Sequence, residues 1–138
     1  MSTLELTGAN FEKTIEDKGI VLIDWWAPWC GPCRAFAPIY DQASTKHPDV
    51  TFGKINTDEQ QELASAFQIS SIPTLMVFRE KILLFAQPGM VPGEAVEELI
   101  TKVKSLDMDM VRKEIAEAEA KGEGADQDED GESSEETG

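Results

Sequence analysis

Two cysteines that lie between an apolar run and a helical pattern constrain this chain more than any other feature. Residues 20–23 are continuously apolar, which is typical of a strand buried on both faces. The segment Trp29-Cys30-Gly31-Pro32-Cys33 follows shortly after. Apolar residues then recur at helical spacing, at Phe36, Ile39, Tyr40 and Ala43. The pattern predicts a strand, a short turn, and a helix whose first turn holds both cysteines.

These two cysteines are the only ones in the chain. A disulfide between them closes a very small loop and removes little entropy from the unfolded chain, so a chemical role is favoured over a structural one. Backbone N–H groups and the positive dipole end at a helix N-terminus favour a thiolate. Cys30 is therefore the predicted nucleophile. Cys33, one turn further into the helix, is the predicted resolving thiol.

The other segments alternate between strand and helix patterns and predict an α/β fold. Expected strands cover residues 4–6, 50–55, 75–78 and 82–85, and expected helices begin near residues 11, 59 and 92. Asn10 and Asp58 precede two of these helices and are predicted to cap them. Pro38 lies inside the helix that follows the cysteines, and a kink is expected there.

A chain of 138 residues suits one domain with a short appendage, which we place at residues 1–106 and 107–138. Apolar residues spaced by three and four predict an extra amphipathic helix over residues 107–121: Met108, Val111, Ile115 and Ala118. Residues 122–138 contain only Gly, Ala, Thr, Ser, Gln and acidic residues. Such a segment cannot bury a core, so it is predicted to be a disordered acidic tail.

The net charge of -15 disfavours binding to nucleic acid, because the phosphates would be repelled. No segment approaches the roughly 20 apolar residues that a membrane span needs, and no basic segment precedes an apolar one at the start. We therefore expect a cytoplasmic protein without a membrane partner. Two cysteines and His47 are too few for the four ligands of structural zinc, so no metal is expected. A metal or cluster shared between two chains remains an alternative, and His47 is predicted to be an exposed polar residue.

The segment around the cysteines is similar to the thioredoxin-family signature, and the similarity extends over about residues 4–106. The other matching positions are Asp24, Pro38, Lys54, Ile72-Pro73-Thr74 and Gly89. The resemblance implies the thioredoxin fold, in which four helices flank a central mixed five-stranded β-sheet. The helical and disordered tail would follow that fold. The resemblance also implies that the peptide bond before Pro73 is cis.

The resemblance further implies a protein disulfide reductase that works by dithiol–disulfide exchange and serves electron transport and cell redox homeostasis. Its redox centre would be the Cys30–Cys33 pair, with no bound cofactor. Its partners would be disulfide-containing proteins and a flavin-dependent thioredoxin reductase as electron donor, and it would act as a monomer. Asp24 would serve as the base for Cys33; burial should raise its pKa, and pairing with Lys54 should oppose that rise. An apolar surface would dock the substrate: Trp29, Gly31, Pro32, Ile72, Pro73 and Gly89.

Other interpretations stay open at this point. The thiols could be inert, Asp24 could cap the turn after its strand, and Lys54 could be a solvated strand residue. A thiol oxidase or isomerase, or a binding subunit with this fold, are the alternative functions. The chain also departs from the family pattern at four places, which puts the choice of partner in doubt: Thr57, Ser71, Glu80-Lys81 and Met90.

Overall fold

The computed structural model describes residues 3–125. The chain divides into a first compact unit that ends at Val103 and a second that begins at Lys104. The elements, in chain order, are β1 (Thr3–Glu5), α1 (Phe11–Asp17), β2 (Ile20–Trp26), α2 (Gly31–Lys46), β3 (Thr51–Asn56), α3 (Gln61–Ala66), β4 (Thr74–Arg79), β5 (Ile82–Pro88), α4 (Gly93–Ser105) and α5 (Met108–Ala125).

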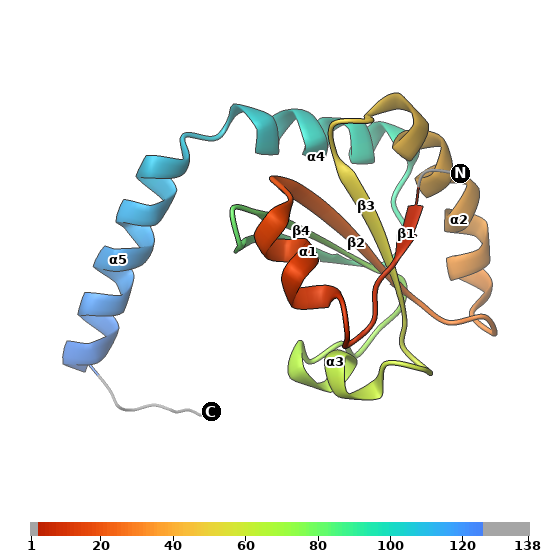
Figure 1. Cartoon of the computed structure of the whole chain (residues 1–138), viewed down its shortest axis with the longest axis horizontal. Helices are drawn as coiled ribbons and strands as arrows, with labels where there is room; N and C mark the ends of the chain where they lie inside the picture. Colours follow the sequence, from red (N-terminus) through yellow and green to blue (C-terminus); the bar gives the residue numbers. More distant parts are fainter. Residues whose placement is uncertain (1–2, 126–138) are drawn as a thin grey trace. The chain divides into compact units, whose positions relative to one another are not determined.

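A mixed sheet with the strand order β1-β3-β2-β4-β5 forms the centre of the first unit (Figure 1). The strands β1, β3 and β2 run parallel, while β4 and β5 are antiparallel to their neighbours. Strand β2 pairs with a neighbour on each side, and residues 21–25 are buried. The expected strand buried on both faces is therefore confirmed.

Helices cover both faces of this sheet. One core cluster joins α2 and α4 to the sheet through residues that include Leu22, whereas another joins α1 and α3 through Val21 and Ile23. Successive side chains on a strand point to opposite faces. Asp24 and Trp26 therefore lie on the same face as Leu22, toward α2 and α4. The predicted architecture of five strands and four flanking helices is confirmed.

Asn10 occupies the N-cap position of α1 as predicted but supplies no side-chain cap, and the capping prediction for Asp58 is wrong. The side chain of Asn10 accepts the N–H of Thr7 at 2.7 Å and makes no cap hydrogen bond to α1, so it closes the preceding turn instead. Helix α3 begins at Gln61, beyond the reach of an N-cap at Asp58. Asn56 supplies the side-chain oxygen that accepts the N–H of Asp58 at 2.9 Å. The carboxylate of Asp58 is thereby left for another contact.

The prediction for His47 is also wrong. This residue caps the C-terminal end of α2, and its side chain is half-buried. Its Nε2 lies 2.6 Å from Oε1 of Glu97, which belongs to α4. Because α2 and α4 pack on the same face of the sheet, a glutamate far away in sequence reaches the end of α2.

The second unit contains α5. Its N-terminus is capped by Asp107, whose carboxylate accepts the N–H groups of Asp109 and Met110 at 3.1 and 3.3 Å. The helix continues to Ala125, four residues past the expected end at residue 121. Helix-favouring Ala, Glu and Lys precede this end and no proline follows to stop the helix. Residues 126–138, most of the predicted disordered tail, lie outside the described residues.

Candidate active site

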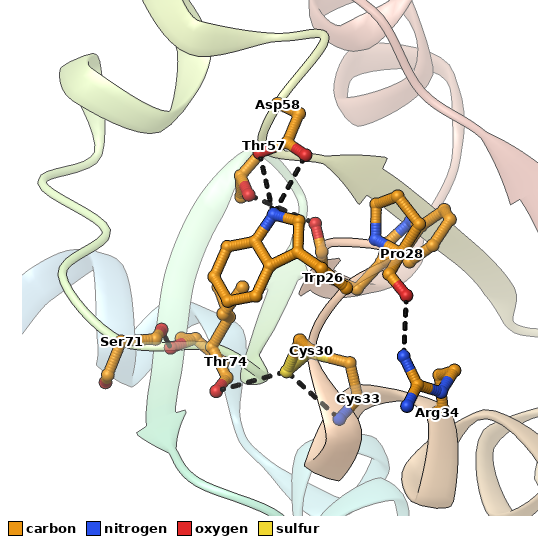
Figure 2. Close-up of a disulfide and its surroundings, with 11 residues drawn as sticks. Trp26, Pro28, Cys30, Cys33, Arg34, Thr57, Asp58, Ser71 and Thr74 are labelled. Atoms are coloured by element: carbon orange, nitrogen blue, oxygen red, sulfur yellow. Dashed lines mark hydrogen bonds between the residues drawn. A yellow bond between two sulfur atoms is a disulfide. The ribbon is translucent and has the colours of Figure 1, made fainter.

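The two cysteines lie where the loop after β2 enters α2, and they form a disulfide with 5.2 Å between their Cα atoms (Figure 2). Cys30 is the N-cap residue of α2, and its Sγ accepts the backbone N–H of Cys33 at 3.2 Å. A cap of this kind normally uses an oxygen side chain. A sulfur at this position receives the same stabilisation of negative charge that a helix N-terminus offers to an anion.

Both cysteine residues are mostly shielded from solvent, since Cys30 is 4% and Cys33 2% exposed. They pack with Ala27, against Trp26 and Ile72. The two cysteines are thus buried to a similar degree, and burial alone does not distinguish the attacking thiol from the resolving one.

A loop before β4 faces the disulfide. The peptide bond between Ile72 and Pro73 is cis, as the resemblance implied. The carbonyl oxygen of Ile72 lies 3.7 Å from Sγ of Cys30. Gly89, with φ at +91°, donates its N–H to the carbonyl of Pro73 at 2.8 Å. A side chain would strain this left-handed conformation, so a glycine suits the position.

Trp29 projects from the loop before Cys30 and is 66% exposed, the most exposed large apolar residue in the described part of the chain. Its indole Nε1 donates to both carboxylate oxygens of Asp58, at 3.0 and 3.3 Å. On the other side of the loop, Arg34 donates to the carbonyl of Pro28 at 2.9 Å (Figure 2). The loop before Cys30 is therefore held at two points, each by a side chain from a neighbouring element.

The sequence pattern predicts neither the contact of Asp58 with Trp29 nor that of Arg34 with Pro28. For Asp58 it predicts a helix cap, because a lone acid before a helical pattern commonly has that role. Nothing in the one-dimensional pattern brings it to Trp29, because the two residues are 29 positions apart. Arg34 follows Cys33 directly, and its charge beside the cysteines was the available signal.

Asp24 is a buried carboxyl in the interior of β2. Its exposed fraction is 1%, and neither carboxylate oxygen has a hydrogen-bond partner. Burial raises the pKa of Asp24 to about 7, while the charge of Lys54 opposes this rise and that of Asp41 adds to it. The interpretation of Asp24 as a turn cap is not supported, since such a cap requires a hydrogen bond from its carboxylate.

Lys54 lies directly opposite Asp24 in the register between β2 and β3. It is half-buried, and its Nζ lies 4.8 Å from the centroid of the Trp26 ring. Lys54 is therefore a neighbour of Asp24 in the sheet, but its ammonium group lies against the ring of Trp26. Tyr40, buried in α2 on the same side, donates its hydroxyl to the carbonyl of Gly53 at 2.7 Å.

Within residues 3–125, no group of three or more His, Cys, Asp or Glu side chains is placed to hold a metal ion. The same part of the chain contains no helix long and apolar enough to cross a membrane.

The reactive group of the site is the Cys30–Cys33 sulfur pair. A disulfide at a helix N-terminus, facing a cis-proline loop and backed by a buried carboxyl, defines a thiol–disulfide oxidoreductase.

Comparison with known proteins gives the family. The Thioredoxin family model matches residues 2–105. "Putative thioredoxin 2" of Streptomyces coelicolor is 54% identical over 116 residues, covering 84% of this chain and 87% of that protein. The thioredoxin of Bacillus subtilis is 37% identical over 103 residues, covering 74% and 98%. The structure of a mutant thioredoxin from Halobacterium salinarum NRC-1 superposes with a TM-score of 0.72 at 30% identity, covering 77% and 94%.

This chain belongs to the thioredoxin family. It is a protein disulfide oxidoreductase whose redox centre is the Cys30–Cys33 pair, and it needs no added cofactor for dithiol–disulfide exchange. Its fold is the thioredoxin fold. Electron transport and cell redox homeostasis are the processes that such a pair serves.

Proposed function

We propose that Cys30 attacks the target disulfide and that Cys33 resolves the resulting complex. The Cys30 thiolate forms a bond to one target sulfur, and the other target sulfur leaves as a thiolate that takes a proton from solvent. The Cys33 thiolate then attacks Sγ of Cys30, which forms the Cys30–Cys33 disulfide and releases the second target sulfur. The observation that carries this proposal is the position of Cys30 as the N-cap of α2, where its sulfur accepts the Cys33 N–H.

Asp24 is the proposed base that takes the proton of Cys33. Support comes from its burial on the face of β2 that points toward α2, and from a pKa of about 7, close to the working pH of a cytoplasmic protein. Two carboxylate oxygens without a hydrogen-bond partner leave this group free to accept a proton. Lys54 is the proposed modulator of that proton affinity, since its charge lowers the pKa of Asp24.

An Asp24→Asn variant should resolve mixed disulfides about a hundred-fold more slowly near pH 7, because an amide takes up no proton. In the unaltered protein the resolving rate should rise with pH as Asp24 loses its proton near pH 7, and the variant should lack this rise. Stopped-flow measurement of target release gives both. The first attack, followed separately in a Cys33→Ser background, is the control and should change little. Equal resolving rates across pH would rule out Asp24 as the base.

The proposed docking surface surrounds the disulfide and consists of Trp29, Gly31, Pro32, Ile72, Pro73 and Gly89. Trp29, Gly31, Pro32 and Gly89 are exposed, Ile72 is half-buried and Pro73 is buried. Thr57 and Ser71 line a shallow depression beside Trp29 and Ile72, so polar groups border the apolar part of the surface. An extended target segment would pair with the backbone at Ile72, next to the sulfur that attacks it.

Reduction of protein disulfides with electrons from a thioredoxin reductase is the proposed physiological direction. Gly31-Pro32 between the cysteines resembles the reducing members of the family. Equilibration with a glutathione or dithiol buffer should give a reduction potential of about -270 mV, the value typical of thioredoxins. A potential near about -180 or -120 mV would indicate the alternative, an isomerase or an oxidase. Reduction by a purified flavin-dependent thioredoxin reductase and NADPH tests the donor directly.

The redox function is proposed to reside in residues 1–106, with residues 107–121 as an added helix and 122–138 as an acidic tail. Residues 2–105 match the family model, and the first compact unit ends at Val103. Deletion of residues 107–138 should leave the rate of disulfide reduction within about two-fold, because every residue assigned to the site belongs to the first unit. A loss of ten-fold or more would show that the segment takes part in the reaction.

We also propose that the protein is a cytoplasmic monomer, since a disulfide reductase works in a reducing compartment. Cell fractionation and sedimentation at several protein concentrations test these two points. Recovery outside the cytoplasm, or a dimer at micromolar concentration, would contradict them.

A further inference from the structure

The ammonium group of Lys54 has two neighbours that could hold it. Asp24 lies opposite Lys54 in the register of β2 and β3, and Trp26 follows two residues later on β2. Residues two apart on a strand share one face. The carboxyl of Asp24 and the ring of Trp26 therefore lie next to each other on one face of β2, and Lys54 lies on the adjacent strand β3.

In the structure, the ammonium group of Lys54 lies against the ring of Trp26 and makes no hydrogen bond to Asp24. Nζ of Lys54 lies 4.8 Å from the ring centroid of Trp26, within the range of a cation–π interaction. Both oxygens of Asp24 lack a hydrogen-bond partner, so the lysine does not donate to them. The backbone of Trp26 is fixed by its carbonyl, which accepts the backbone N–H of Thr57 at 2.8 Å and the hydroxyl of Thr57 at 3.1 Å, whereas its buried indole Nε1 has no hydrogen-bond partner.

We propose that Trp26 is a positioning residue that holds the Lys54 ammonium over its indole ring and withholds it from the Asp24 carboxylate. Trp26 thereby sets how readily Asp24 exchanges a proton with Cys33. The functional part of this inference rests on the proposed role of Asp24 as the base. The geometric part concerns only Trp26, Lys54 and Asp24.

The ring of Trp26 and the carboxyl of Asp24 attract the ammonium group under different conditions. The ring attracts the ammonium group whether Asp24 is protonated or ionised. The carboxyl attracts it strongly only when ionised, so a lysine free to move to Asp24 would favour the ionised form. By competing for the lysine, the ring keeps Asp24 able to bind a proton near neutral pH.

The other groups that face Asp24 leave Lys54 as the cation that matters in the described part of the chain. From α2, Asp41 adds negative charge and raises the pKa of Asp24. The Tyr40 hydroxyl, also from α2, is engaged with the carbonyl of Gly53. From β4, the residue in register with Asp24 is the apolar Leu75. The position of Lys54 is thus the variable that tunes the carboxyl.

The test is an NMR titration of the Asp24 carboxyl in the full-length oxidised protein. Trp26→Leu removes the ring and should lower the Asp24 pKa by about 0.5 to 1, because Lys54 becomes available to the carboxylate. Trp26→Phe keeps a weaker ring and should lower it less. Lys54→Met removes the cation and should raise the Asp24 pKa. Trp26→Leu in the Lys54→Met background should then cause no further fall.

Two results would overturn the proposal. An Asp24 pKa that stays the same or rises in Trp26→Leu would show that the ring does not withhold the lysine. An equal fall in the Lys54→Met background would show that Trp26 acts by excluding water rather than by holding the cation. If Trp26→Leu does not fold, 5-fluorotryptophan placed at position 26 alone serves instead, since it weakens the cation–π interaction with little change in size. It should lower the pKa in the parent protein and leave it unchanged in Lys54→Met.

This titration is independent of whether Asp24 carries the proton of Cys33. If Asp24 is not the base, the resolving rate of Asp24→Asn will be unchanged while the response of the carboxyl to Trp26 and Lys54 persists. If Trp26 does not position Lys54, the resolving rate will still depend on Asp24. The two failures are therefore distinguishable.

Discussion

A Cys30→Ser variant should reduce protein disulfides at least about a thousand-fold more slowly than the unaltered protein, because a serine hydroxyl is not ionised near pH 7 and does not attack sulfur. The measurement is the release of thiol from a disulfide-linked protein substrate, with a dithiol as electron donor. Cys33→Ser is the matched control, since it makes the same atomic change three residues away. It should still attack, but it should accumulate a stable mixed disulfide through Cys30.

The trapped complex also reports on the proposed docking surface. If a target segment pairs beside Cys30, the amide resonances of Ile72 and Gly89 should shift and exchange more slowly in the mixed disulfide. A complex that accumulates in Cys30→Ser, and an inactive Cys33→Ser that traps nothing, would reverse the assigned roles. Unchanged amides at both positions would place the target elsewhere.

An Asp24→Asn variant should gain stability relative to the unaltered protein as the pH rises. Burial raises the pKa of Asp24 from its ordinary 3.8 to about 7 in the folded protein. Between about pH 4 and pH 7 the folded state keeps a proton on Asp24 that the unfolded state has released. The free energy of unfolding of the unaltered protein therefore falls as the pH rises through this range, from its full value below about pH 4 to its lowest value above about pH 7. The full difference corresponds to about 4 kcal/mol.

Urea unfolding of both oxidised proteins between pH 4 and pH 9 tests this prediction. The difference in unfolding free energy should grow up to about pH 7 and stay level above it. The buried amide that replaces the carboxyl adds an offset of its own, so the growth with pH is the informative quantity. Glu59→Gln, at an exposed carboxyl, is the control and should change the free energy by less than about 0.5 kcal/mol. A pH-independent difference for Asp24→Asn would mean that Asp24 stays ionised when buried.

Much of the fold was predictable because local patterns and tertiary packing agree. The apolar run at residues 20–23 is a strand that pairs on both sides, and α1 begins at residue 11, where a helix start was expected. The errors fall where one polar side chain had several partners within reach. The local pattern predicts side-chain helix caps at Asn10 and Asp58, yet each side chain bonds elsewhere once the chain is folded.

For the site, the sequence by itself determined which atoms react. Two cysteines at the predicted start of a helix, with a glycine and a proline between them, follow from the order of residues, because helix periodicity and capping act over a few positions. The acid on the buried strand was likewise visible, since an aspartate after four apolar residues must be desolvated.

Only the tertiary structure decided how those atoms are surrounded. It brought the carbonyl of Ile72 to 3.7 Å from Cys30, Asp58 to Trp29, and Glu97 to His47, in each case between segments far apart in the chain. It also placed Lys54 over Trp26 rather than on Asp24. Strand register sets which residues are neighbours, and competition between partners sets which neighbour a charged side chain chooses. Both depend on contacts that no local pattern contains.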